Sequence, residues 1–292
     1  MSSAQPTLAR LLESWSFDPV VVLALLAAGL LYGAGVATLR ARARPWPLAR
    51  AASFAAGLLA LALALLSGID ALADELLSVH MVQHLLLALL APALLLYGAP
   101  VRLALSAGSP AVRAAMVGVL RTRAVRALAH PALGCVAFAS VVLAWHLTGL
   151  FELALKHPGV HVLEHAAYFW AGALLLAPLI AADPLPHRPG AVGRFCWMMA
   201  AMTAMAVPGA LLAFAPTVRY PFYVASAHAL GRSALADEHV AGAIMWVAGG
   251  VTMFALALAV TASAMLAEER RQLRRELYAA APAGARSRAV GR

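Results

Sequence analysis

Two pairs of histidines, each with a spacing of four residues, stand near the ends of hydrophobic segments. One pair is His80 and His84, in the run HMVQH, and the other is His161 and His165, in the run HVLEH. Imidazole is the commonest side-chain metal ligand, and four helical residues advance about 6 Å, so both rings of a pair share one face. Two pairs that meet from separate helices would build a metal site. Two further histidines at segment ends are candidate ligands: His146 and His239.

Acidic residues beside these histidines could support the same site. Glu164 lies within the second pair, where it would either bind the ion or accept the second N–H of a ligating imidazole. Asp237 and Glu238 directly precede His239 at the start of the last hydrophobic segment. Asp237 has an equally simple role as the N-cap of that helix. One isolated pair would favour ordinary hydrogen bonding by interfacial histidines, but two pairs with further histidines nearby favour a metal.

Methionines form a helical stripe in a later hydrophobic segment, with Cys196 one turn away: Met198, Met199, Met202 and Met205. Thioether and thiol are soft ligands that suit Cu(I). Methionine is also a flexible side chain that fills gaps in apolar cores. Because the stripe begins near the side opposite to the histidines, core packing is the favoured interpretation.

The composition indicates a membrane protein. Of the 292 residues, 63% are hydrophobic and 12% are charged, which is more apolar surface than a soluble domain can bury. The formal charge of +9 comes from arginines in short patches between apolar segments. This pattern is typical of membrane topology and of contact with anionic membrane lipid, and it argues against nucleic-acid binding. The two cysteines, Cys135 and Cys196, lie inside apolar segments and indicate no disulfide framework.

We therefore expect an all-α polytopic membrane protein with one bundle of seven transmembrane helices in residues 19–267. Crossing about 30 Å of hydrocarbon takes about 20 helical residues, and the segments long enough are 19–39, 49–68, 76–98, 131–151, 160–182, 194–215 and 239–267. Residues 110–128 carry too many arginines to span and predict an amphipathic helix on the cytoplasmic surface. Pro208 predicts a break in the sixth span. The ends are expected to be an extracytoplasmic segment without a cleaved signal peptide, 1–18, and a basic cytoplasmic tail, 268–292.

Lysine and arginine are distributed unequally between the two sides of this bundle. Of the 22 such residues, 18 fall in segments on one side, and the other side holds only Arg10, Lys156, Arg219 and Arg232. Positive residues accumulate on the cytoplasmic side. The N-terminus is therefore expected outside and the C-terminus inside, and all the candidate ligand histidines then lie toward the outer compartment.

Longer motifs around these histidines resemble the multi-span CtaG assembly factors of cytochrome c oxidase. The resemblance rests on HMVQHLLL at 80–87, APALLLYGAP at 91–100, Trp145-His146, HVLEH at 161–165, and Asp237 through AGAIMW at 241–246. It covers most of residues 20–265. Where the family has Asp-Gln-Gln, this chain has Asp237-Glu238-His239, so His239 is a candidate ligand on its own chemistry only.

The resemblance implies a factor of the bacterial inner membrane that helps to form an active haem–copper oxidase and is not itself an enzyme. The implied step is the placing of copper in the catalytic subunit, and the implied partners are that subunit and other assembly factors. Copper would be bound transiently, because an assembly factor must also release it. Zinc is a second possible metal, since imidazole binds both.

Several other functions compete with this interpretation. Residues 161–165 fit the H-x-x-E-H pattern of inverted zinc peptidases, with Glu238 a conceivable further ligand, so a membrane-embedded zinc hydrolase or peptidase is the main alternative. A di-iron oxygenase would place its histidine boxes on the cytoplasmic side. A haem-binding cytochrome would need two axial histidines that face each other. A transporter would need charged groups that continue to the inner side.

Overall fold

The computed structural model describes residues 13–280, of which the backbone alone is described for 278–280. Helices make up nearly all of this part of the chain, and no strand occurs in it, which confirms the all-α prediction. In chain order the elements are α2 (Pro19–Ala41), α3 (Leu48–Leu66), α4 (Gly68–Ala73), α5 (Leu77–Leu85), the π-helix η1 (Leu86–Leu90), α6 (Ala91–Tyr97), α7 (Pro100–Ala107), α8 (Pro110–Leu120), α9 (Arg123–Leu128), α10 (Pro131–Leu147), α11 (Leu150–Lys156), α12 (Pro158–Ile180), α13 (Ala191–Ala213), the 3-10 turn η2 (Pro221–Tyr223), α14 (Val224–Ala229), α15 (Ala234–Ala243), the π-helix η3 (Ile244–Ala248) and α16 (Gly249–Ala280).

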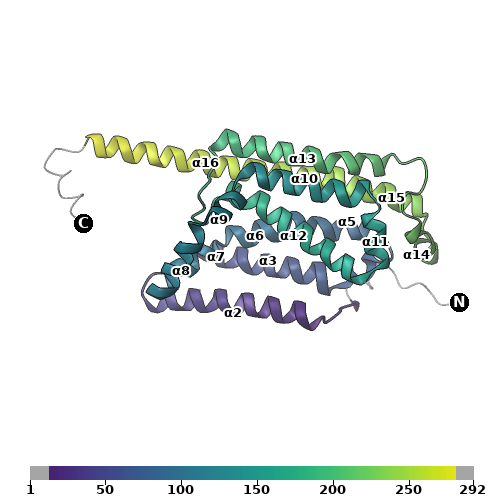
Figure 1. The fold of residues 1–292 in the computed structure, drawn as a ribbon, viewed down its shortest axis with the longest axis horizontal. Coiled ribbons are helices and arrows are strands. Elements are labelled where there is room, and N and C mark those ends of the chain that lie inside the picture. Colours follow the sequence, from purple (N-terminus) through teal and green to yellow (C-terminus); the bar gives the residue numbers. More distant parts are fainter. Residues whose placement is uncertain (1–12, 281–292) are drawn as a thin grey trace.

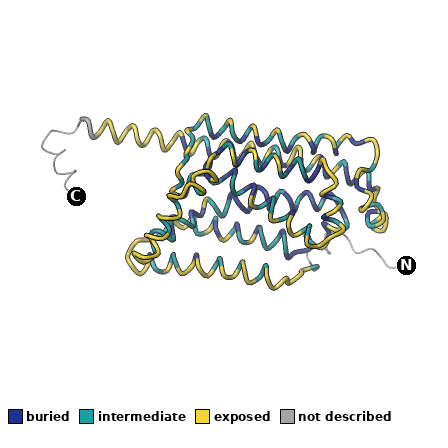
Figure 2. The backbone as a smooth tube through the Cα atoms, in the orientation of Figure 1, coloured by how far each residue is buried: buried dark blue, intermediate teal, exposed yellow. Residues whose placement is uncertain are grey.

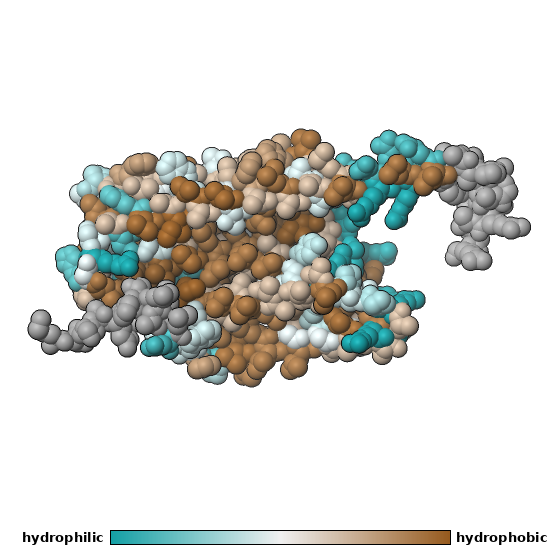
Figure 3. All heavy atoms as spheres, turned by 180° about the vertical axis from the view of Figure 1, so that it is seen from behind, coloured by the Kyte–Doolittle hydropathy of each residue, from teal (hydrophilic) through white to brown (hydrophobic). Residues whose placement is uncertain are grey.

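Six helical segments in the described residues are long and apolar enough to cross a membrane: Pro19–Ala41, Leu48–Leu66, Leu77–Ala107, Pro158–Ile180, Ala191–Ala213 and Ala234–Leu277. A seventh is obtained if α10 and α11, which meet at an angle of 72°, form one broken span. Large apolar side chains such as Leu30, Trp170 and Val251 are exposed on these helices, and Figure 3 shows the resulting hydrophobic band between more polar ends. The chain is therefore a multi-pass membrane protein.

The span formed by α5, η1 and α6 lies in the interior of the bundle. It packs against α3 on one side and against α12 on the other, while α13 and α16 pack together nearby. Figure 1 shows this arrangement, and Figure 2 shows that buried positions gather in the middle of the bundle whereas α2 is largely exposed. Tyr32, Leu39, Phe54 and Leu103 attach α2 to α3 and α7 through a small separate core.

Two spans contain a π-helical turn, and close helix packing occurs beside both. Gly172 of α12 lies so near η1 that a methyl group in its place would collide with the carbonyl of Ala88. Gly209 of α13 faces the backbone of Trp246 in η3 in the same way. Small residues allow this approach of helix backbones in membranes. Single π-turns are frequent near functional sites, because they change the direction in which neighbouring side chains point.

The two ends of the bundle differ in charge. Figure 1 shows α8, α9 and the projecting part of α16 at one end, and α11 and α14 at the other. Arginines from several elements line a cavity of about 640 Å³ at the first end: Arg50, Arg102, Arg188, Arg194 and Arg271. The patches that were grouped on one side from the sequence thus come together in space. Which compartment this end faces stays a prediction.

Some local predictions need correction. Residues 110–128 form two helices, because the side chain of Thr122 caps α9 and ends the continuous path from α8. Pro208 does not break its span, since α13 continues through it to Ala213. The segments 1–12 and 281–292 of the predicted terminal regions lie outside the described residues. Of the described remainder, Asp18 caps α2, and the helix α16 continues to Ala280.

Replacing Gly172 by alanine tests whether the contact between α12 and η1 is as close as it is here. The added methyl group must push the Ala88 carbonyl away, and overpacking of this kind costs about 1–3 kcal/mol. Gly33→Ala is the matched control, because nothing lies within 4 Å of its added carbon and removal of a helical glycine is stabilising. Thermal unfolding in detergent should show a lower midpoint for Gly172→Ala and an unchanged or higher one for Gly33→Ala. Equal midpoints would contradict the close contact.

Candidate metal centre

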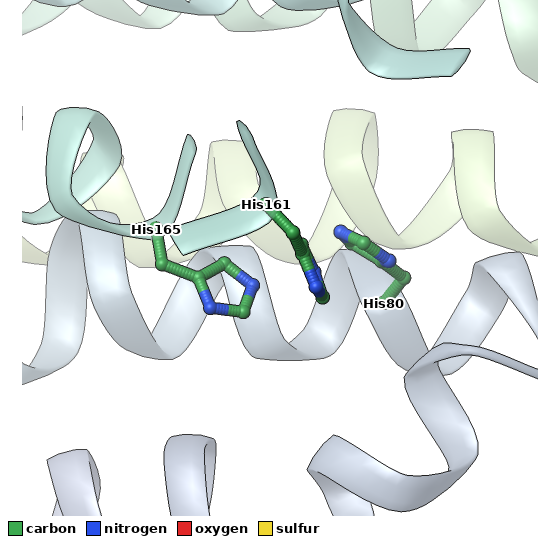
Figure 4. A group of neighbouring side chains, drawn as sticks. All are labelled: His80, His161 and His165. Carbon is green, nitrogen blue, oxygen red and sulfur yellow. The ribbon is translucent and has the colours of Figure 1, made fainter. Parts of the chain in front are cut away.

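The two histidine pairs come together in space. Within each pair the rings are close, with centroids 4.4 Å apart for His80 and His84 and 4.2 Å apart for His161 and His165. Between the pairs, the centroids of His80 and His161 are separated by 5.2 Å. Figure 4 shows the two histidines of α12 extending toward His80 on α5. The expected meeting of the third and fifth predicted spans thus agrees with the structure, because α12 packs on η1 and α6, which continue α5.

Two overlapping sets of ligand atoms result, and His80 belongs to both. In each set the atoms lie within 4.8 Å of one another: His80, His161 and His165 in one, and His80, His84 and Glu164 in the other. The Nε2 atoms of His80 and His84 are 3.0 Å apart. Two imidazole nitrogens bound tetrahedrally to one ion at about 2.0–2.1 Å lie about 3.3 Å apart. Small side-chain shifts would therefore bring either set to the distances of a metal site.

Many polar atoms of this cluster are buried without a hydrogen-bond partner in the described part of the chain: His84 Nδ1, His146 Nε2, His161 Nε2, His165 Nε2, Glu164 Oε1 and Glu164 Oε2. His80 and Glu164 are 0% exposed. A buried polar atom that makes no hydrogen bond costs about 1–3 kcal/mol, so one orphaned atom is unusual and a group of them needs an explanation. A cation bound by either set would satisfy those of the atoms that belong to it.

Neighbouring groups fix which nitrogen of two histidines carries the lone pair. The Tyr223 hydroxyl donates to the Ala73 carbonyl at 3.2 Å, so at its 3.0 Å contact with His80 it accepts from Nδ1–H. His146 donates its Nδ1–H to the Val142 carbonyl at 2.9 Å. Both histidines thus keep Nε2 unprotonated, which is the form that binds a metal. A hydrogen bond from the other ring nitrogen is the usual support of a ligating imidazole.

Aromatic rings enclose the cluster. The bend between α10 and α11 places Phe151, which is fully buried, with its ring centroid 5.0 Å from His80 and 5.9 Å from His146. Tyr168 stacks on His84 with centroids 4.1 Å apart. These contacts restrict the imidazole rotamers and exclude water on those sides. His161 and His165 are only half-buried, so the cluster is least enclosed on the side of α12.

The carboxylates of Asp237 and Glu238 accept hydrogen bonds from backbone N–H groups and do not line the histidine cluster. Asp237 accepts the backbone N–H of Ser78 at 3.1 Å and also its hydroxyl, so it caps the first turn of α5 from another helix. Its own helix, α15, is capped by Ser233, so the prediction that Asp237 is the N-cap of that helix is wrong. Glu238 accepts the N–H of Arg219 at 2.9 Å. Asp237 therefore fixes the turn that carries His80.

The structure separates His239 and Gln83 from the cluster. His239 is half-buried, its Nε2 lies 2.8 Å from the Ala215 carbonyl, and it belongs to neither set of ligand atoms. Gln83 donates to the Ala64 carbonyl and to Asp70, each at 2.8 Å, on the side of α5 that faces α3 and α4. His146 lies close to the cluster, with its ring centroid 6.2 Å from that of His84, but it belongs to neither set of ligand atoms.

Sequence reasoning missed several residues that shape the cluster. Tyr223 and Phe151 gave no signal, because an aromatic residue outside the histidine motifs does not show in the sequence which ring it will contact. Met81 and Met245 lie inside motifs that were quoted for other reasons, and they join Met205 in lining a small cavity next to His84 and His146. In the stripe itself, Met198 is buried in the main core, in agreement with the packing interpretation, whereas Met205 belongs to that core and also lines the cavity.

In a comparison with known proteins, residues 30–266 match the family described as cytochrome c oxidase caa3 assembly factor (Caa3_CtaG). An uncharacterized protein of Mycobacterium tuberculosis is 32% identical over 249 residues, which cover 82% of this chain and 38% of the relative, and a Mycobacterium bovis protein gives the same values. A Mycobacterium leprae protein is 26% identical over 282 residues, covering 94% of this chain and 43% of the relative. The chain thus spans less than half the length of these curated relatives. No solved structure matches.

Asp70, outside the spans, makes stability depend on pH. Burial raises its pKa to about 6, partly offset by the hydrogen bond from Gln83, and Asp74 and Asp18 raise it further. Because the folded pKa exceeds the ordinary 3.8, the folded state binds the proton more tightly, so stability falls as pH rises from about 4 through 6. Asp70→Asn should raise the thermal midpoint at pH 7.5, and the gain should shrink at pH 4.5. A gain that does not change with pH would contradict this assignment.

Removing the carboxylate of Asp237 tests its role in positioning α5. Asp237→Ala leaves the buried N–H of Ser78 without its partner, which should cost about 1–3 kcal/mol. The unfolding midpoint in detergent should fall, and Asp237→Asn, which keeps an acceptor oxygen, should recover part of the loss. If alanine and the native residue give the same midpoint, the contact does not hold α5 in place.

Proposed function

The chain belongs to the cytochrome c oxidase caa3 assembly factor family, and we propose that it carries copper for the catalytic subunit of a haem–copper oxidase. The ion is held transiently by histidines of α5 and α12, in a site that faces the periplasm from the bacterial inner membrane. The chain acts as a carrier and not as an enzyme. Its partners are the catalytic subunit and other assembly factors.

The convergence of unpaired imidazole nitrogens is the observation that carries this proposal. Five histidines from α5, α10 and α12 gather at one end of the bundle, and four of them have a buried ring nitrogen without a partner. Histidine inside a membrane protein is costly to bury and commonly faces a ligand. Imidazole binds Cu(I), Cu(II) and zinc, so the donor set fits the cargo that the family implies.

The overlap of the two ligand sets suits a carrier that must release its ion. His80 offers only Nε2, because Nδ1 is engaged by Tyr223. One ion bound by His80 can therefore be completed either by the half-buried His161 and His165 or by the buried His84 and Glu164. Exchange between these sets needs only ligand replacement. A site with alternative partners releases an ion more readily than one closed tetrahedral cage.

Charge supports the proposed orientation. The arginine-rich end fits the cytoplasmic side, which puts the histidines toward the periplasm. Near the histidine end, Asp70 and Asp74 would attract cations to the site. At the opposite end, the cavity lined by arginines fits the predicted contact with anionic membrane lipid.

A membrane zinc hydrolase is a second candidate, favoured by one observation. Glu164 lies between the two histidines of the H-x-x-E-H run, and His161 and His165 join His80 as a three-histidine set, with Glu164 in the position of a general base. However, Glu164 is 0% exposed, and the cavity beside His84 is only about 20 Å³. That volume holds one water-sized particle, whereas a hydrolase needs room for a substrate.

Copper binding by the four paired histidines is directly testable. The purified protein should bind copper, and replacement of His80, His84, His161 and His165 by alanine should weaken binding by more than about 100-fold, since loss of supporting groups alone costs 10–100-fold. His130→Ala with His187→Ala is the matched control, because these rings are also neighbours, 4.9 Å apart, but lie at the arginine-rich end. Copper should be measured by elemental analysis after dialysis, together with oxidase formation in cells.

Two results would contradict the proposal. One is equal copper retention by the two variants, which would mean nonspecific binding to imidazole. The other is stoichiometric zinc with hydrolysis of peptide or lipid that depends on Glu164, which would favour the hydrolase.

A further inference from the structure

A small cavity lies beside the histidine cluster, and both methionines and histidines contribute to its wall. Its volume is about 20 Å³. Three methionines from three different segments line it, Met81 of α5, Met205 of α13 and Met245 of η3, together with His84 and His146. Gly249 has no side chain, and this absence leaves room for the sulfur of Met205.

Two imidazoles at this cavity have a nitrogen that nothing else uses. Nδ1 of His84 and Nε2 of His146 are both buried and make no hydrogen bond within the described residues. His146 cannot turn to satisfy Nε2, because its Nδ1–H is held by the Val142 carbonyl at 2.9 Å. His84 is stacked on Tyr168 and is likewise restrained. Core packing would explain the three methionines, but it would not explain the two unpaired imidazole nitrogens beside them.

The chemistry of these donors selects one kind of ligand. Thioethers are soft donors that bind Cu(I) and are poor ligands for zinc. The walls carry no carboxylate, so a doubly charged ion would remain unneutralised here. A cavity of this size could also hold one water molecule, which needs two to four polar partners. A water molecule would leave the three thioethers without a partner, so a monovalent soft cation fits the full set of lining side chains better.

We propose that this cavity is a second station for the ion, specific for Cu(I). The inference rests on the proposed copper function and adds an inner position, made by His84, His146 and the three methionines, to the outer position at His80, His161 and His165. His84 connects them, since its Nε2 lies 3.0 Å from Nε2 of His80 while its Nδ1 is free for the inner station. Transfer between the stations exchanges ligands and moves no electron, so the ion remains Cu(I).

X-ray absorption at the copper edge tests the inner station without any measurement of oxidase activity. Protein loaded with Cu(I) under a reductant should show a sulfur scattering shell and bind up to two Cu(I), whereas zinc should reach only one per chain. The triple variant Met81→Leu, Met205→Leu and Met245→Leu should lose the sulfur shell and one Cu(I) but keep its zinc. Methionine-to-leucine changes conserve volume and cost less than about 1.5 kcal/mol each.

Met198→Leu with Met253→Leu is the matched control, because both residues are 0% exposed in the same core but do not line the cavity. The control should retain the sulfur shell and both Cu(I) ions. Loss of the shell in the control, or a native spectrum with only nitrogen and oxygen scattering, would overturn the inner station. If the native protein binds neither Cu(I) nor zinc through its histidines, the proposed function fails as well, so the two failures are distinguishable.

Discussion

Lone pairs on buried imidazoles are the constraint around which the interior of this protein is arranged. A histidine nitrogen inside a membrane bundle has no bulk water to bind, and leaving it unpaired costs free energy. Here several such nitrogens face one another, together with a carboxylate that accepts no hydrogen bond from the described residues. Packing alone gives no reason to collect these groups. The proposed cation would give one, because its binding would satisfy the groups that converge on it.

The surrounding structure serves to hold these rings in place. Gly172 lets α12 approach η1, so the histidines of α12 reach those of α5. Asp237 caps the first turn of α5, and Tyr223 fixes the tautomer of His80. These contacts come from η2 and α15, at the far end of the chain from α5. The site therefore depends on the complete bundle, and a change distant in sequence can disturb the candidate ligands.

Much of this could be predicted from the sequence, for identifiable reasons. The i,i+4 spacing of His80 and His84 determines a shared helix face whatever the fold, and hydrophobic length gives the spans. The family resemblance read from the same motifs is confirmed by the match over residues 30–266. The contact of His239 with a backbone carbonyl and the capping of α5 by Asp237 could not be predicted from the sequence. Both depend on which helices become neighbours in the fold. The cavity shared by Met81, Met205 and Met245 could not be predicted either, because it forms only when α13 packs beside the other two segments.

The proposed function requires that imidazoles from α5 and α12 bind the same ion. Anomalous X-ray diffraction at the copper absorption edge, from crystals of the copper-loaded protein, tests it most directly. A peak is expected about 2.0–2.1 Å from Nε2 of His80 and at a similar distance from a ring nitrogen of His161 or His165. A peak bound by residues of one helix only, or located away from these histidines, would contradict it.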